Sequence, residues 1–203
     1  VQKEGGGTEE VMKELAARNI RSFLAGGFDA IITNAGGCGS NVKEYDHLLR
    51  NTPYAARAKA FVAKCRDITE FLAEIGTVAQ YKPIKARVAY HDSCHLQHAQ
   101  KVRTQPRQLL RAIPGMEVVD VPEAPLCCGS AGIYNLVQPS TANELADRKA
   151  ALIAPLNAGA IATGNPGCLL QIGAALERSS QKTPILHTIQ ILDASLRGES
   201  LPS

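Results

Sequence analysis

The sequence predicts an α/β protein built from two related strand–helix repeats, with a mostly parallel sheet and cysteine-bearing turns at the carboxyl ends of its strands. Two observations indicate this fold class. Short apolar runs of strand length alternate along the chain with longer segments of helical periodicity, and that alternation favours parallel pairing. In addition, the segment at residues 14–38 resembles the segment at residues 144–168 at matching positions, as the two copies of a duplicated unit would.

The first copy is predicted to contain a helix, a strand and a turn. Apolar residues recur at helical spacing from about Thr8 to Leu24, and a threonine followed by two glutamates suits a helix start. After a pair of glycines, the apolar run from Phe28 to Thr33 is expected to be a buried strand that enters a glycine-rich turn. Residues from about Tyr54 to Ile75 predict one connecting helix, closed by Gly76.

The second copy is predicted to alternate strands and helices up to its last cysteine turn. The expected strands are residues 87–91, 116–121 and 159–163, and the expected helices are residues 98–112 and 140–156. A Tyr-Lys-Pro boundary near residue 81 divides the chain into two domains. Residues 1–80 hold a truncated first repeat with its connecting helix, and residues 81–203 hold the second repeat. Because the carboxyl ends of parallel strands share one edge of a sheet, the cysteine turns are expected to converge there.

Composition excludes several classes of protein. The 203 residues are 45% hydrophobic and 20% charged, which suits a soluble chain with a core that needs no disulfides. The net charge is only +3, and the sequence has no basic stretch with aromatic residues interleaved among the lysines and arginines. Both observations argue against a nucleic-acid partner. We see no transmembrane run and no secretory signal. Six cysteines without a signal point to the cytoplasm, where thiols serve as ligands or catalysts. Since the first residue is Val1, we expect a fragment.

Four cysteines lie in turns rich in glycine, proline or histidine: Cys94, Cys127, Cys128 and Cys168. A cysteine that only packs behaves as a small hydrophobe and is expected inside an apolar run. Thiols in such turns can instead approach one point while backbone amides donate hydrogen bonds to sulfur, and metal and iron–sulfur sites are built in this way. These four residues are therefore the predicted metal ligands.

Four neighbours of these cysteines are expected to support the site without binding the metal directly. His91 and His95 flank Cys94 and, with turn amides, could offset the negative charge of several thiolates. Gly129 and Gly167 lack a Cβ and would let the backbone approach the metal closely.

The other two cysteines are predicted to have different roles. Cys38 lies in the glycine turn of the first repeat without partner cysteines nearby in sequence, so it is a candidate metal ligand of an incomplete first site. Cys65 lies in a stretch of helical pattern with no turn around it, and we expect it to be a passive core thiol.

The spacing from Cys94 to the Cys127–Cys128–Gly129 triplet, and onward to Cys168, resembles the cysteine-rich CCG domain family. That family includes the cysteine-rich component of heterodisulfide reductase and the iron–sulfur subunits of glycolate and lactate oxidases. The flanking residues are similar as well, above all His-Asp-Ser-Cys-His-Leu at 91–96 and Thr-Gly-Asn-Pro-Gly-Cys at 163–168. They are most similar to the C-terminal portion of glycolate oxidase iron–sulfur subunits.

The resemblance implies an electron-transfer subunit of a 2-hydroxy acid (glycolate) oxidase complex, an oxidoreductase. Such a subunit carries an iron–sulfur cluster, here expected to be [4Fe–4S]. It receives electrons from a flavin-binding catalytic subunit and passes them to an acceptor such as quinone. No catalytic residue and no substrate site are then expected in this chain. The complex would be cytoplasmic, or peripheral at the inner face of the membrane.

The chain departs from the family pattern in three ways. It lacks the cysteine runs of a ferredoxin-like domain, and its first repeat lacks the Cys-Cys-Gly triplet. Cys168 is followed by Leu169, Leu170 and Gln171, so the last cysteine of the pattern is absent. A simple [4Fe–4S] cluster or a single metal ion is therefore favoured over the noncubane cluster of heterodisulfide reductase.

Two alternatives remain open from the residues alone. Four thiolates suit a structural zinc ion, which would add stability and no redox activity. A metal-free thiol or disulfide module would use the Cys127–Cys128 pair, with His91 or His95 as base.

Overall fold

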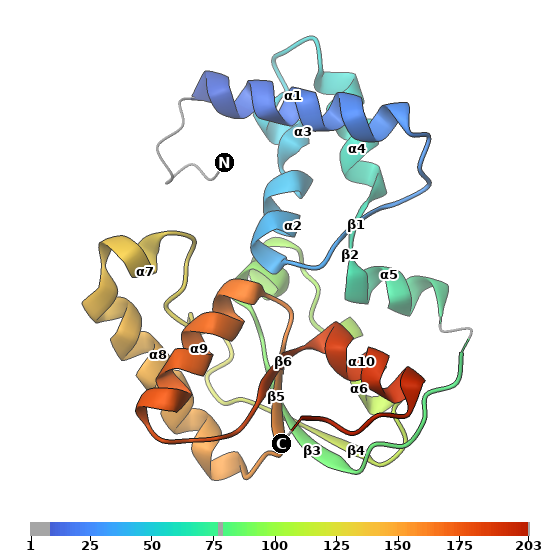
Figure 1. The fold of residues 1–203 in the computed structure, drawn as a ribbon. Helices are drawn as coiled ribbons and strands as arrows, with labels where there is room; N and C mark the ends of the chain where they lie inside the picture. Colours follow the sequence, from blue (N-terminus) through green and yellow to red (C-terminus); the bar gives the residue numbers. More distant parts are fainter. Residues whose placement is uncertain (1–8, 77–78, 203) are drawn as a thin grey trace.

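The computed structural model describes residues 9–76 and 79–202 and confirms the predicted α/β class (Figure 1). In chain order the elements are α1 (Glu9–Ala25), β1 (Ile31–Thr33), α2 (Gly36–Lys43), α3 (Tyr45–Leu48), α4 (Ala55–Lys64), β2 (Cys65–Asp67), α5 (Ile68–Ile75), β3 (Ala86–His91), the π-helix η1 (His95–Ala99), α6 (Gln105–Arg111), β4 (Met116–Asp120), α7 (Tyr134–Val137), α8 (Pro139–Ile153), the 3₁₀ helix η2 (Ala154–Leu156), β5 (Ala160–Thr163), α9 (Pro166–Arg178), β6 (Ile185–His187) and α10 (Thr188–Arg197). None of the described helices is long and apolar enough to cross a membrane.

Within residues 9–76 and 79–202, all the strand pairs are parallel. The larger sheet has the order β4-β3-β5-β6, and β1 pairs with β2 in a separate two-stranded sheet. In the larger sheet the central strands β3 and β5 are fully buried over most of their length, as expected for parallel strands covered on both faces.

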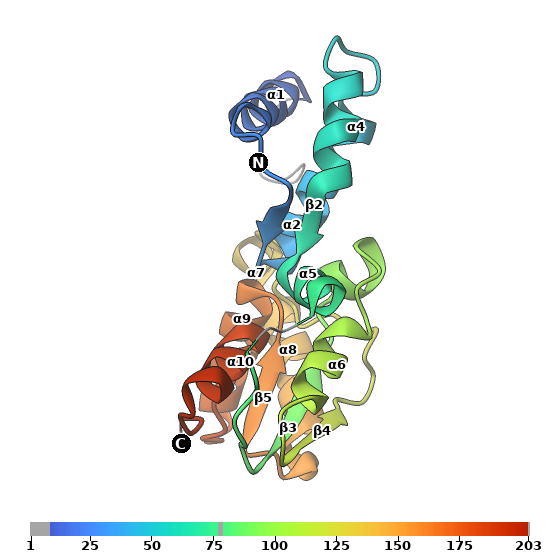
Figure 2. The same cartoon turned by 90° about the vertical axis from the view of Figure 1, so that its right-hand side faces the viewer.

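Helices cover both faces of the larger sheet (Figures 1 and 2). On one face, Ala89 and Ile161 pack with apolar residues of α8 and α9. On the other face, Val88, Tyr90 and Ala162 pack with residues of α6 and α10. This alternation follows from the two-residue period of a strand. Cys128 and Cys168 belong to the α8–α9 core, so the cysteine turns are anchored in packed structure.

The first part of the chain has a core of its own. Ile20 of α1, Ile31 of β1, Tyr45 of α3 and Phe61 of α4 pack together there. The rings of Tyr45 and Phe61 stack with centroids 5.5 Å apart. This part extends away from the larger sheet (Figure 2) and meets the second part through contacts of α2 with η1 and of α5 with α6 and α10.

The prediction of one connecting helix at residues 54–75 was wrong. Strand β2 interrupts it, because Cys65 takes an extended conformation and pairs opposite Ile31. Asp67 then starts a new helix by a capping box with Glu70, a device that satisfies the free amides of the first turn. The Asp-x-x-Glu spacing was a visible signal of this start.

The helix expected at residues 98–112 is also divided. The chain forms the short π-helix η1 and then α6, with a break in which Lys101 has φ of 62°. A non-glycine residue in this left-handed region cannot continue a right-handed helix. The buried strand expected at residues 28–33 is present only as the three-residue strand β1, in which Ile31 alone is buried, while Phe28 and Ile32 are exposed. The other predicted strands and helices are present with small shifts of their ends.

The order helix, strand, helix, strand, helix occurs near both ends of the chain. It is formed by α1, β1, α2, β2 and α5 in the first part, with two extra helices inserted, and by α8, β5, α9, β6 and α10 in the second. Such an order is what a duplicated unit would show. The domain division at residues 80 and 81 stays a prediction.

Candidate metal centre

The four predicted ligand cysteines lie together beyond the carboxyl ends of the larger sheet. Cys94 follows β3, Cys168 follows β5, and the Cys127–Cys128 pair lies in the loop after β4. Cys128 Sγ is 2.9 Å from Cys168 Sγ. Cys127 hydrogen-bonds to Cys94 on one side and to Cys128 on the other. The four sulfurs therefore form a continuous chain in the order 94, 127, 128, 168.

The sulfurs of this chain differ in their affinity for protons. The hydrogen bond from Cys128 lowers the pKa of Cys127 and also lowers the pKa of Cys168 well below its usual value. The partners Cys94 and Cys128 have raised pKa values, first because each shares a hydrogen bond with Cys127 and then because of burial. The two cysteines with a lowered pKa, Cys127 and Cys168, therefore alternate along the chain of sulfurs with the two whose pKa is raised. A bound cation would displace the remaining protons, because cysteine binds metals as thiolate.

Backbone amides of the Cys-Cys-Gly turn donate to the sulfurs. Gly129 N is 3.4 Å from Cys127 Sγ, Ala131 N–H donates to the same sulfur, and Ser130 N–H donates to Cys128. Gly129 and Ala131 have φ of 89° and 30°. Such a turn directs successive N–H groups to one side, and this concavity favours anions. The turn therefore offsets part of the charge of several thiolates.

Helix α9 adds to this stabilisation. Cys168 is its third residue, where the free amides and the helix dipole favour negative charge. Asn165, the residue before the helix, places its side-chain nitrogen 3.5 Å from Cys168 Sγ.

The two predicted glycines lie at points of close approach. A Cβ on Gly129 would lie 2.2 Å from the Ala142 carbonyl oxygen of α8. A Cβ on Gly167 would lie 2.4 Å from Ser130 Oγ. Both contacts are far shorter than van der Waals distance. The glycines therefore allow the cysteine turns to pack against α8 and against each other.

The two predicted histidines also lie at the site. His91 is only 1% exposed, and its ring has a nitrogen within 4.8 Å of the sulfurs of Cys128 and Cys168. Neither ring nitrogen of His91 has a partner in normal hydrogen-bond geometry among the described residues, but the ring interacts with Cys168 and helps to lower the pKa of that thiol. His91 would therefore lie beside a metal or cluster bound at Cys168. His95 Nδ1 is 3.5 Å from Cys94 Sγ.

Cys38 and Cys65 lie in different surroundings. Cys38 is exposed and is the third residue of α2. It lines a cavity of about 210 Å³ together with Cys94, Cys128 and Cys168. Cys65 is 1% exposed in the core of the first part, and burial raises its pKa to about 11. The core position expected for Cys65 is present, although the residue begins a strand instead of lying in a helix.

Sequence reasoning missed a buried lysine behind the Cys-Cys-Gly turn. Lys149 of α8 is 0% exposed, donates from Nζ to the Glu123 carbonyl oxygen at 2.5 Å, and has its pKa lowered by burial. Its charge acts on both Cys127 and Cys128. The signal was present in the helix, because Ala142, Ala146 and Lys149 share the helical spacing of the buried face.

An ion pair beside the first cysteine turn was missed as well. Arg107 donates to both carboxylate oxygens of Asp92, one at 2.9 Å and the other at 2.5 Å. It also lies over the Tyr90 ring, 4.5 Å from the centroid. Because the Asp92 side chain is 3% exposed, this pair fixes the turn that leads from β3 into Cys94.

The donor set therefore fits a metal ion or an iron–sulfur cluster. Thiolates suit zinc and iron–sulfur clusters alike. Four thiolates carry more negative charge than a divalent ion balances, and the turn amides, the α9 dipole and Lys149 lie where they compensate for the excess.

Comparison with known proteins gives a consistent result. A family model described as "CCG: Cysteine-rich domain" matches residues 4–43 and 88–173. The first matched stretch includes Cys38, and the second includes the four cysteines of the chain of sulfurs.

Several named relatives match over most of the chain. A "Probable glycolate oxidase iron-sulfur subunit" from Bacillus subtilis is 42% identical over 191 residues, which are 92% of this chain and 43% of that protein. One subunit of the fumarate reductase (CoM/CoB) of Methanothermobacter marburgensis is 34% identical, over 92% of this chain and 36% of its own length. A "Lactate utilization protein A" from Geobacillus kaustophilus is 30% identical, over 90% of this chain and 76% of its own length. The chain thus spans less than half of the first two relatives.

Proposed function

Because the chain belongs to the CCG cysteine-rich domain family, we propose that it is an iron–sulfur module that transfers electrons within an oxidoreductase complex. The observation that carries this proposal is the continuous chain of sulfurs from Cys94 to Cys168, held by turn amides. Hydrogen bonds to sulfur are one of the means by which proteins adjust the potential of a cluster.

The proposed ligands are the four cysteines of the chain of sulfurs: Cys94, Cys127, Cys128 and Cys168. His91 lies beside two of these sulfurs and helps to lower the pKa of Cys168, so it would hydrogen-bond to the cluster. His95, Gly129 and Gly167 support the ligands through the contacts described above. When bound, a [4Fe–4S] cluster would accept and release single electrons, while the protein holds the ligands and adjusts their charge.

The proposed complex oxidises a 2-hydroxy acid such as glycolate. This assignment is supported by the 42% identity to the Bacillus protein named as a probable glycolate oxidase iron-sulfur subunit. A flavin-binding subunit would oxidise the substrate, and this module would pass the electrons to an acceptor such as quinone. The complex would lie in the cytoplasm, at the inner face of the membrane when the acceptor is a quinone.

A redox titration of the anaerobically loaded full chain tests the proposal. The chain is loaded with iron and sulfide, and its visible absorbance is followed against potential. We expect reversible bleaching that follows a one-electron curve, about 59 mV per tenfold change in ratio. Cys128→Ser should lose the absorbance, while Cys65→Ala should keep it, because Cys65 lies in the separate core of the first part.

Two results would contradict the proposal. A colourless protein that binds one zinc ion and shows no redox response would assign a structural role to the site. A metal-free protein with one rapidly alkylated thiol would assign thiol chemistry. In the complete complex, glycolate should reduce the cluster and bleach its absorbance in the absence of oxygen. If lactate bleaches the absorbance and glycolate does not, the substrate of the complex is another 2-hydroxy acid.

A further inference from the structure

A buried lysine lies behind the turn that carries the two adjacent cysteines. Lys149 belongs to α8 (Figure 1), is fully buried, and lies on the same helix face as the buried residues Ala142 and Ala146. Burying the charge of a lysine is costly unless negative groups balance it. The groups around Lys149 therefore indicate the role of its charge.

A hydrogen bond holds Lys149 against the loop of the cysteine pair. Lys149 Nζ donates to the Glu123 carbonyl oxygen at 2.5 Å, and Leu126 N donates to the same oxygen at 2.9 Å. Leu126 directly precedes Cys127, so the ammonium lies behind the segment that leads into the pair. Because this carbonyl oxygen already has a backbone donor, the loop does not require a charged side chain for its hydrogen bonds.

Four negative groups act on Lys149. In order of decreasing effect they are Glu123, Cys128, Asp92 and Cys127, with the two cysteines acting as thiolates. Burial is the largest influence and lowers the pKa of the lysine, and the four negative groups oppose it. The ammonium is therefore stabilised by acidic neighbours on the side of the cysteine turns.

The two carboxylates among these groups have other cations as partners. Glu123 Oε2 lies 2.6 Å from the guanidinium of Arg148, in a pair exposed to solvent. Both carboxylate oxygens of Asp92 accept hydrogen bonds from Arg107. The negative charge that remains for the buried ammonium to balance is that of the adjacent cysteines.

Small residues bring α8 close to the cysteine turn. Ala146 and Ala150 belong to the same buried cluster as Cys128, and a Cβ on Gly129 would lie 2.2 Å from the Ala142 carbonyl oxygen. An interior packed in this way contains little water. A charge on the buried face of α8 therefore interacts with charge at the sulfurs more strongly than an exposed charge does.

We infer that the ammonium of Lys149 sets the reduction potential of the cluster held by the four cysteines and makes that cluster easier to reduce. The inference rests on the proposed function, because it assigns a role toward the same cluster. A reduced flavin supplies one electron, and the net charge of the site falls by one. No bond forms or breaks, and Lys149 keeps its proton. A fixed positive charge stabilises the reduced form more than the oxidised form. Lys149 acts through the ligand sulfurs and is thus a positioning residue.

Redox titration of the full chain, loaded with iron and sulfide, tests the inference. Lys149→Met removes the charge and keeps an unbranched side chain, while Lys149→Gln removes the charge and keeps a hydrogen-bond donor. At a fixed potential, each should lower the ratio of reduced to oxidised cluster at least about tenfold, which is a downward shift of about 59 mV for one electron. Lys149→Arg keeps the charge and should change this ratio less than about threefold.

Arg148→Met is the matched control. It removes the same unit charge from the neighbouring residue of α8, whose side chain is 59% exposed. Because solvent screens an exposed charge, we expect the ratio to change at most about twofold, and this change should disappear in about 1 M salt. The shift in Lys149→Met should persist in that salt, because a buried charge is screened much less.

Three results would overturn the inference while the cluster of the parent chain stands. If the potentials of Lys149→Met and Lys149→Gln shift no more than that of Arg148→Met, the charge does not act on the cluster. Neutral variants that fold, as circular dichroism shows, but hold no iron and sulfide would assign the lysine to assembly of the site. Neutral variants that do not fold would assign it to structure alone. A parent chain that binds no iron and sulfide would overturn the proposed function and, with it, this inference.

Discussion

Replacing Gly129 by alanine should damage the cysteine site through the backbone alone. Gly129 follows the adjacent cysteines and has φ of 89°. The new Cβ would lie 2.2 Å from the carbonyl oxygen of Ala142 and 3.0 Å from its carbonyl carbon. These are backbone atoms of α8, so no side-chain rotation can relieve the contact.

The expected destabilisation has two parts. A residue with a Cβ in the left-handed region costs about 1–2 kcal/mol. Inserting a methyl group into closely packed structure costs a further 1–3 kcal/mol, roughly. Gly129→Ala should therefore lower the free energy of unfolding by about 2–5 kcal/mol. If the loop moves to avoid the clash, the sulfurs of Cys127 and Cys128 move with it, and cluster content falls.

Gly27 supplies a matched control. It has φ of 65°, and a Cβ there would meet no atom within 4 Å. Gly27→Ala should cost only the conformational part, about 1–2 kcal/mol. Urea unfolding of both variants measures the free energies, and iron and sulfide assays measure the content of the site.

The reasoning would be refuted by a simple result. If Gly129→Ala is no more destabilising than Gly27→Ala and binds the same amount of iron and sulfide, the close approach of the turn to α8 does not hold the site.

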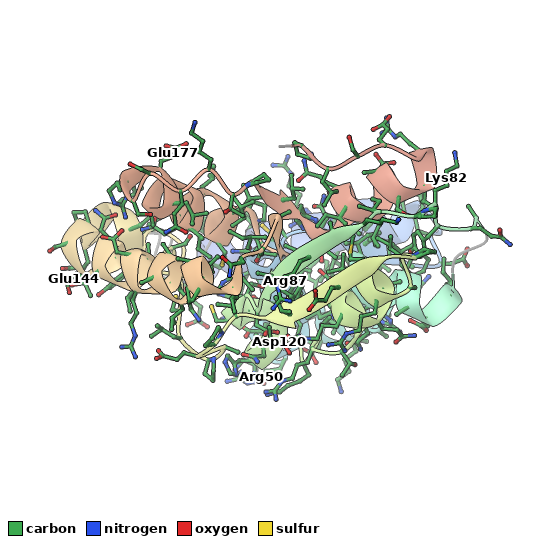
Figure 3. The ribbon with its side chains drawn as sticks, turned by 90° about the horizontal axis from the view of Figure 1, so that it is seen from below. Arg50, Lys82, Arg87, Asp120, Glu144 and Glu177 are labelled. Atoms are coloured by element: carbon green, nitrogen blue, oxygen red, sulfur yellow. The ribbon has the colours of Figure 1, made fainter. Side chains whose placement is uncertain are left out.

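The remaining predictions concern charge, pH and the core. Arg107→Met should lower the free energy of unfolding by about 3–5 kcal/mol, since it leaves the buried Asp92 carboxylate without its partner. Arg87, labelled in Figure 3, forms an exposed ion pair with Glu117, and Arg87→Met should cost at most about 1 kcal/mol. Equal losses in urea unfolding would contradict this. Burial lowers the pKa of His187 below its unfolded value of about 6.5, so its contribution to stability is present above that pH and is lost as the pH falls. The loss of stability at low pH should be smaller in His187→Asn, which keeps a helix-capping side chain. If the free energy of unfolding depends on pH identically in the variant and the parent chain, His187 is not the cause. Cys65→Ala should unfold at lower urea but bind as much iron as the parent chain, because the residue is buried far from the cavity cysteines in sequence and core; reduced iron content would contradict that separation.

The gathering of the cysteine turns could be predicted from the sequence. Cys94 and Cys168 each follow a strand of the same parallel sheet, and the carboxyl ends of such strands meet at one edge. The flanking residues also indicated the CCG family, which the comparisons confirm. The glycine-rich turns around the cysteines made this prediction possible, because glycines in a sequence indicate where the backbone turns sharply or approaches another segment closely.

Features that depend on distant pairing could not be predicted in the same way. Strand β2 has three residues and follows a helical pattern without a break, so its pairing with β1 decides its conformation. The place of Cys38 depends on how α2 docks, and that docking uses backbone groups of Gly36 and Gly164. Backbone hydrogen bonds between distant turns leave little trace in the side-chain pattern.

Iron, zinc and acid-labile sulfide, measured together on the anaerobically purified full chain, test the central claim most directly. The account predicts iron and sulfide in equal amounts, no zinc, and loss of both iron and sulfide in Cys128→Ser. One zinc ion per chain without sulfide, or iron and sulfide that survive both Cys128→Ser and Cys168→Ser, would contradict it.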